Sequence, residues 1–172
     1  MQSEGQLVQV DDNWQVRFTR NLRHSPDKVW RALTEPERLA AWFPTEIIGE
    51  RTDGAPLRFE FRNGEGPGFD GTMITCMPPR LLEFAWGEDV LRFELEPDGP
   101  GTVLTLTDTI GQLGKASRDS AGWHVCLERL DFALAGEAKE PTSWKTLNAI
   151  YVERFGPEAS TIGPPEGHPE AS

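Results

Sequence analysis

The sequence lacks the features on which several classes of protein depend. No stretch approaches the eighteen or more apolar residues that a membrane-spanning helix needs. The start of the chain has neither the basic nor the apolar region of a secretory signal. Basic residues are scarce, because 17 Lys and Arg stand against 28 Asp and Glu and give a net charge of −11. We therefore expect a cytoplasmic protein that binds neither nucleic acid nor an anionic membrane surface.

Residues that hold metals or form disulfides are also few. The only cysteines, Cys76 and Cys126, do not form a C-x-x-C pair. In a cytosolic chain we expect both thiols to be reduced and buried, and a disulfide between them is the alternative. The histidines, His24, His124 and His168, are far apart in the sequence, so we expect no metal site and no cofactor.

Motifs of phosphate binding and hydrolysis are missing as well. Gly64, Gly66 and Gly68 join two expected strands instead of leading into a helix, and no Lys-Ser/Thr pair follows them. The chain contains neither a G-x-S-x-G nor an H-E-x-x-H motif. No nucleophile, base and orienting acid are therefore brought together by the sequence pattern.

The first third of the chain predicts a strand followed by two short helices. Apolar and polar residues alternate at the start of residues 14–22, as in a half-buried strand. Ser25, Pro26 and Asp27 are typical of a helix start, since they supply a cap, a favourable first position and a charge that suits the helix dipole. A second short helix follows Pro36.

The rest of the chain predicts a strand meander covered by a long helix. The strands are connected by short turns, which favours antiparallel pairing. A helix over 118–135 carries Trp123, Leu127, Leu130 and Leu134 on one face and ends at Gly136. A further helical pattern spans 144–155. The expected strands cover 57–62, 69–77, 82–86, 91–95 and 102–110.

One domain accounts for this pattern. We expect an N-terminal extension over residues 1–13, a domain over 14–156 and a mobile tail over 157–172, because the tail has too few apolar residues to pack.

Several stretches resemble a known family. They are 25–34 (SPDKVWRALT), 42–44 (WFP), Gly71 with 78–86 (PPRLLEFAW), Gly122-Trp123 and 151–156 (YVERFG). In this order they resemble the START-like (SRPBCC) superfamily, and within it the bacterial proteins similar to the C-terminal domain of the activator of heat shock protein 90 ATPase. The resemblance implies an α+β helix-grip fold, in which a curved antiparallel sheet wraps around a long C-terminal helix. Relatives in the superfamily bind lipids, hormones or polyketides between sheet and helix, and a few are cyclases or dehydratases.

Large apolar side chains are expected on the inner face of this sheet and on the covering helix. They either line a ligand pocket or fill the core. The candidate ligand-binding residues of this kind are Phe59, Phe61, Phe84, Trp86, Phe93, Trp123, Leu127 and Leu130.

Two charged residues share that inner face. Alternation with Leu104, Leu106 and Ile110 turns Asp108 inward, and Arg20 continues the inward positions of the first strand. If the first and last strands are neighbours, Arg20 and Asp108 form a buried pair or hold a polar group of a ligand. The alternative is that both strand ends reach water.

His124 lies at the edge of the helix's inward face. It is either a general acid or base, or a flanking residue paired with Glu128 four positions on, which we favour. Val125 and Phe132 either form an exposed apolar seam for a partner or second copy, or are covered by residues 144–155.

Three functions follow from these observations. The favoured one is binding of a small hydrophobic molecule in a cavity, with no covalent chemistry. The second is a cyclase- or dehydratase-type reaction on an apolar, polyketide-like substrate, using Asp108, Arg20 or His124. The third is a co-chaperone-like protein that binds a partner, with homodimerisation as one form of it.

Overall fold

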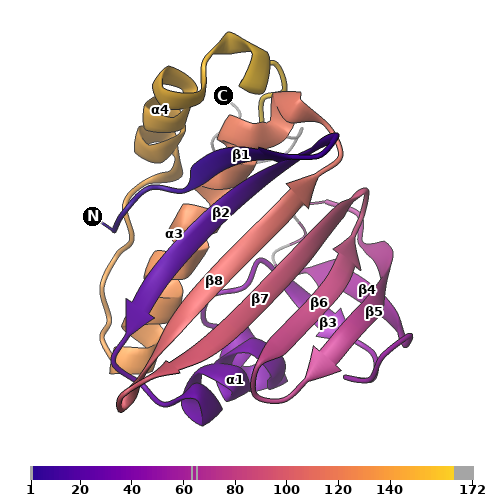
Figure 1. Cartoon of the computed structure of the whole chain (residues 1–172), viewed down its shortest axis with the longest axis vertical. Helices are drawn as coiled ribbons and strands as arrows, with labels where there is room; N and C mark the ends of the chain where they lie inside the picture. The colour runs from indigo at the N-terminus through magenta and orange to yellow at the C-terminus, as the bar shows by residue number, and fades with distance from the viewer. Residues whose placement is uncertain (1, 63, 65, 165–172) are drawn as a thin grey trace.

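The computed structural model describes residues 2–62, 64 and 66–164. Within these residues it consists of one antiparallel sheet covered on one side by helices (Figure 1). The strands are β1 (Gln6–Val10), β2 (Asn13–Leu22), β3 (Thr45–Ile48), β4 (Pro56–Phe61), β5 (Phe69–Met77), β6 (Leu81–Trp86), β7 (Asp89–Asp98) and β8 (Gly101–Ile110). The helices are α1 (Pro26–Thr34), α2 (Pro36–Leu39), α3 (Ala116–Ala135) and α4 (Trp144–Phe155), with short 3₁₀ turns η1 (Leu113–Lys115) and η2 (Pro157–Ala159).

The strand order is β1-β2-β8-β7-β6-β5-β4-β3. The meander from β3 to β8 is therefore antiparallel throughout, as its short turns predict, and β2 returns to pair with β8. Alternate residues of β2 and β8 are buried, which puts Val16, Phe18 and Leu106 on the covered face. The expected helix-grip α+β fold is confirmed.

The start of α1 follows from its sequence. The hydroxyl of Ser25 accepts a hydrogen bond from the backbone N–H of Lys28 at 3.3 Å, and Pro26 occupies the first turn. The second short helix, α2, begins directly after α1, as predicted.

The long helix α3 lies against the covered face of the sheet (Figure 1). Its predicted inward residues Trp123, Leu127, Leu130 and Leu134 are all buried. Gly136 ends the helix with a φ of 68°, the left-handed conformation that glycine adopts without strain. None of the helices in the described part of the chain is long and apolar enough to cross a membrane.

Both ends of the chain differ from the expected boundaries. Residues 6–10, placed in an extension, form β1 and pair with β2. Asp11, with a φ of 54°, closes the hairpin between them. Their apolar residues Leu7, Val8 and Val10 do not alternate strictly, which hid the strand.

Part of the expected tail is also packed. Ala159 is only 1% exposed, and Ser160 forms a hydrogen bond of 2.7 Å with Ser117 of α3. The backbone N–H of Ile162 donates to the carbonyl of Gly114 at 3.1 Å. The expectation of a mobile tail is therefore wrong for residues 157–162, and residues 165–172 lie outside the described part.

Candidate functional site

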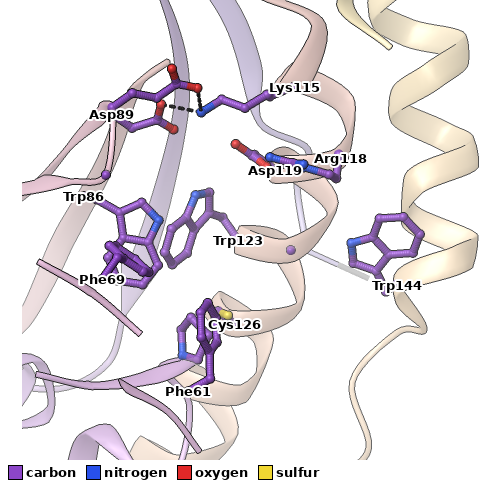
Figure 2. A pocket seen from close by; sticks show the side chains of 14 residues that line it. Phe61, Phe69, Trp86, Asp89, Lys115, Arg118, Asp119, Trp123, Cys126 and Trp144 are labelled. Carbon is purple, nitrogen blue, oxygen red and sulfur yellow. Dashed lines mark hydrogen bonds and ion pairs between the residues drawn. The ribbon is translucent and has the colours of Figure 1, made fainter. Parts of the chain in front are cut away.

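A cavity of about 410 Å³ opens between the sheet and the N-terminal half of α3 (Figure 2). Charged residues gather at one end of it, near Lys115, whereas Phe61 and Cys126 lie at the other end. The lining residues are Pro44, Phe61, Phe69, Trp86, Gly87, Glu88, Asp89, Lys115, Arg118, Asp119, Gly122, Trp123, Cys126 and Trp144.

Aromatic rings form the walls of the cavity. Phe61 ends β4, Phe69 begins β5 and Trp86 ends β6, so the sheet contributes them where its strands end. The ring centroids of Phe69 and Trp86 are 4.8 Å apart, and those of Trp86 and Trp123 are 5.7 Å apart. Rings packed edge to face in this way hold one another in place.

Two glycines shape the space around these rings. Gly71 lies so close to Phe59 that a Cβ would come within 2.5 Å of its ring, so glycine at this position leaves room for the buried ring. Gly122 on α3 borders the cavity, and a Cβ built there meets no atom within 4 Å. The helix therefore leaves open volume at this point.

The charged end of the cavity begins with Asp89 and Lys115. The ammonium of Lys115 donates to Asp89 Oδ1 at 2.7 Å and lies 2.8 Å from Glu88 Oε1. Asp89 Oδ1 also accepts from the backbone N–H of Gly111 at 3.0 Å. Burial opposes the charge of Lys115, but the hydrogen bonds to both carboxylates outweigh it and raise its pKa.

Asp108 lies behind Trp123 and is 1% exposed. Its Oδ2 accepts a hydrogen bond from the indole N–H of Trp123 at 3.0 Å, whereas Oδ1 has no partner among the described residues. Burial raises the pKa of Asp108 well above its usual range, and the charges of Asp89 and Asp119 raise it further.

Asp119 completes a group of three carboxyls. One carboxylate oxygen from each of Asp89, Asp108 and Asp119 lies within 4.8 Å of the other two. Arg118 donates to Asp119 Oδ1 at 2.8 Å. Burial still raises the pKa of Asp119, although Arg118 lowers it in part.

The candidate binding residues divide between the cavity and the core. Three of them line the cavity: Phe61, Trp86 and Trp123. Their role in ligand binding stays a prediction. The inner part of the space between sheet and helix is filled instead. The residues that lie there, each at most 1% exposed, are Phe59, Phe84, Phe93, Leu127 and Leu130.

The hypothesis of an Arg20–Asp108 pair is wrong. Both side chains are buried and β2 does pair with β8, as expected. However, Asp108 lies opposite Val16 and Arg20 lies opposite Leu104. Four residues of strand, about 13 Å, therefore separate the two charges. Arg20 instead donates to Gln2 Oε1 at 2.6 Å and to the carbonyl of Thr19 at 3.0 Å.

His124 is also outside the cavity lining. Its Nε2 lies 3.6 Å from Glu128 Oε2, so the two residues are neighbours as expected but form no hydrogen bond, and His124 is fully buried instead of flanking the inward face. The hydroxyl of Tyr151 accepts a hydrogen bond from the N–H of Gly5 and forms a second hydrogen bond, of 2.8 Å, with His124 Nδ1. Burial lowers the pKa of His124 to about 4, and nearby Arg20 adds to the effect.

The remaining sequence expectations concern the thiols and the apolar seam. Cys76 and Cys126 are both free, as favoured, although Cys76 is only half-buried. Burial raises the pKa of Cys126 to about 12, so its thiol stays protonated at the cavity.

The structure argues against an exposed apolar seam formed by Val125 and Phe132. Val125 is buried. Phe132 is half-buried, and the ammonium of Lys139 lies 5.8 Å from the centre of its ring.

Sequence reasoning missed Phe69, Trp144 and the charged end of the cavity. Charged residues usually reach water at the places where these three side chains stand: Asp89 begins β7, Lys115 ends η1 and Asp119 lies in the first turn of α3. The alternation of inward and outward residues along β5 could have indicated Phe69, which is the first residue of that strand.

Comparisons with known proteins agree with this architecture. A family model described as activator of Hsp90 ATPase homolog 1-like protein matches residues 23–135. Among solved structures, a conserved protein of unknown function from Enterococcus faecalis, EF2215, is 22% identical with a TM-score of 0.76, covering 88% of this chain and 90% of that one.

Two further structures are similar. CalU16 from Micromonospora echinospora is 21% identical with a TM-score of 0.69, over 88% of this chain and 92% of that one. The protein encoded by BPP1335 of Bordetella parapertussis is 26% identical with a TM-score of 0.66, over 88% and 89%. No curated protein matches the chain significantly.

Proposed function

The chain belongs to the family of activator of Hsp90 ATPase homolog 1-like proteins, and from this premise we propose that it binds a small, flat, apolar molecule between its sheet and α3. The proposal includes no covalent chemistry. Its main support is the cavity walled by Phe61, Phe69, Trp86 and Trp123.

The size and chemistry of the cavity suit such a ligand. Small-molecule sites typically measure about 300–1,000 Å³ and combine apolar walls with a few polar groups. The cavity, at about 410 Å³, is walled by aromatic side chains and has its charged groups at one end. A flat aromatic or polycyclic molecule makes more contact with aromatic walls than a molecule of another shape does.

Gly122 offers a direct test, since Gly122→Leu would place a side chain in the open volume. Native mass spectrometry of freshly purified protein should show a retained small-molecule adduct, or uptake of one from a library of aromatic compounds. The Gly122→Leu variant should lose this adduct and keep its melting temperature, because leucine also favours the helix more than glycine does. Ala135→Leu, at an exposed position near the end of α3, is the matched control.

Two outcomes contradict the proposal. One is the absence of any bound or captured apolar molecule in the unmodified protein. The other is an adduct retained equally by Gly122→Leu and Ala135→Leu, which would place binding outside this cavity.

One observation favours the enzyme alternative. The raised pKa of Asp108 describes a carboxyl that holds a proton, as a general acid must. Asp108 does not line the cavity, however, so a proton would have to pass through Asp119 or Asp89. Turnover of a polyketide-like substrate that Asp108→Asn abolishes would support this alternative over simple binding.

A further inference from the structure

We infer that Phe43 limits the size of the ligand, because its ring fills the space behind two walls of the cavity, Trp86 and Trp123. The cavity then accepts a compact apolar molecule and excludes one that extends deep between sheet and helix, such as a long acyl chain. This inference rests on the proposed function and names the class of molecule bound.

Three rings from separate parts of the chain form a closed triangle beside the cavity. The ring centroid of Phe43 lies 5.3 Å from that of Trp86 and 5.7 Å from that of Trp123. The centroids of the two indoles are also 5.7 Å apart (Figure 2). Trp86 ends β6, Trp123 lies in α3, and Phe43 lies between α2 and β3. The triangle therefore joins the sheet, the covering helix and the α2–β3 connection.

Phe43 stands between the cavity and the filled interior. Both indoles line the cavity, and so does Pro44, but the ring of Phe43 is not part of the lining. Phe43 is only 2% exposed. Its ring also packs 5.2 Å from that of Trp42 and 6.3 Å from that of Phe84, measured between centroids. One side chain thus contacts both the cavity walls and the core.

The interior on this side of Phe43 has no room for a ligand. Phe43 lines a small void together with Trp42, Phe84 and Phe93, and this void is too narrow to admit a water molecule. Removal of the Phe43 ring would enlarge the void and bring it up against the cavity walls. The same ring therefore keeps the two spaces apart.

The two cavity walls are held in different ways. Trp123 donates its indole N–H to Asp108 Oδ2 at 3.0 Å, which fixes the direction of its ring. Trp86 is packed between rings, with centroids 4.8 Å from Phe59 and 5.3 Å from Phe43. Without the ring of Phe43, Trp86 could turn into the vacated space while Trp123 keeps its hydrogen bond. The cavity would then become deeper.

The length of an apolar ligand can show where the cavity ends. Each methylene that moves from water into an apolar site strengthens binding about fourfold. A methylene that remains in water adds almost nothing. The affinity for chains of increasing length should therefore rise until the chain fills the cavity as far as the rings, and then stop rising.

A series of 4-alkylphenols, from 4-methylphenol to 4-octylphenol, tests the inference by isothermal titration calorimetry. These probes share one ring and differ only in chain length. For the wild type we expect the gain per carbon to end before the octyl chain. In Phe43→Ala the gain should continue for at least about three further carbons, because loss of a phenyl ring leaves a space of several carbon atoms.

Phe93→Ala is the matched control. It removes the same ring from another wall of the narrow void but leaves Phe43 in place, so it should keep the length limit of the wild type. Both variants delete a buried phenylalanine and should lower the melting temperature to a similar extent. A change in the length limit of Phe43→Ala alone is therefore not an effect of lower stability. If an alanine variant does not fold, Phe43→Leu and Phe93→Leu replace the pair, with an expected shift of about one carbon.

Each outcome has a separate meaning. The same length limit in wild type and in the Phe43 variant overturns the inference and leaves the proposed function intact. An equal extension in the Phe93 variant does so too, as does a wild-type affinity that rises through the whole series. Binding of no alkylphenol despite a retained small-molecule adduct also overturns the inference alone. Absence of both alkylphenol binding and any adduct overturns the proposed function with it.

Discussion

The indole N–H of Trp123 donates a hydrogen bond to Asp108 Oδ2 at 3.0 Å. The same ring therefore forms part of the cavity wall and partners the most deeply buried carboxyl beside it. A change in the position of this ring would alter both the shape of the apolar space and the environment of Asp108. The two parts of the site are coupled through one side chain.

Trp123→Phe should destabilise the fold more than Trp86→Phe. Both changes replace an indole at the cavity by a smaller phenyl ring. Only Trp123→Phe also leaves Asp108 Oδ2 without its hydrogen-bond donor. A buried acceptor without a partner costs about 1–3 kcal/mol. Urea unfolding at neutral pH would measure the difference, and equal losses in the two variants would mean that the Trp123–Asp108 bond contributes nothing to stability.

Asp108→Asn should change how stability depends on pH. Below the unfolded-state pKa of about 3.8 the carboxyl of Asp108 is protonated in both states. As pH rises towards the higher pKa of the folded state, only the unfolded chain releases the proton, so the free energy of unfolding falls. Asparagine keeps an acceptor for Trp123 and does not titrate.

Unfolding curves at several pH values above 4 would show the effect as a difference between the two proteins. The wild type should lose stability relative to Asp108→Asn as pH rises, and the variant should be at least as stable at neutral pH. Parallel pH profiles would contradict a raised pKa for Asp108.

The pattern of alternation in the sequence was enough to predict which way Asp108 and Arg20 face. Both are on the covered side, and their strands are neighbours. Alternation says nothing about register, however, because a shift of two residues keeps every side chain on its face. The register between β2 and β8 is decided by packing along the whole sheet, and it separates the two charges.

The charged end of the cavity was beyond sequence reasoning for a different reason. Lys115 and Asp89 are 26 residues apart and come from a 3₁₀ turn and a strand start. Neither position has a periodic pattern that marks it as buried. They meet only in the folded chain, where the ammonium of Lys115 contacts Asp89 Oδ1 at 2.7 Å (Figure 2).

Two truncations should differ in stability. Removal of residues 165–172 should change the melting temperature little, since that segment is polar and rich in proline and glycine. Removal of residues 157–172 should lower the melting temperature clearly. It uncovers the surface against which Ala159 is buried, and it removes the hydrogen bonds of Ser160 and Ile162 to residues around the start of α3. Thermal melts followed by circular dichroism would decide, and identical melts would show that the contacts of 157–162 do not stabilise the domain.

His124 should make the fold sensitive to acid. Its pKa is about 4 in the folded protein and near 6.5 when unfolded. Its contribution is therefore fully present above pH 6.5 and is lost as pH falls towards 4, because the unfolded chain takes up the proton first. The full difference amounts to about 3 kcal/mol. The charged groups near the ring are Arg20 on β2, Glu128 on α3 and Glu4 before β1.

His124→Asn is the matched variant, since its side-chain amide can either donate to or accept from the Tyr151 hydroxyl and does not protonate in this range. Urea unfolding at pH 7.5 and pH 4.5 should show a larger loss for the wild type than for the variant. An NMR titration of the imidazole would give the folded-state pKa directly. A ring that titrates near 6.5 would contradict the effect of burial on His124.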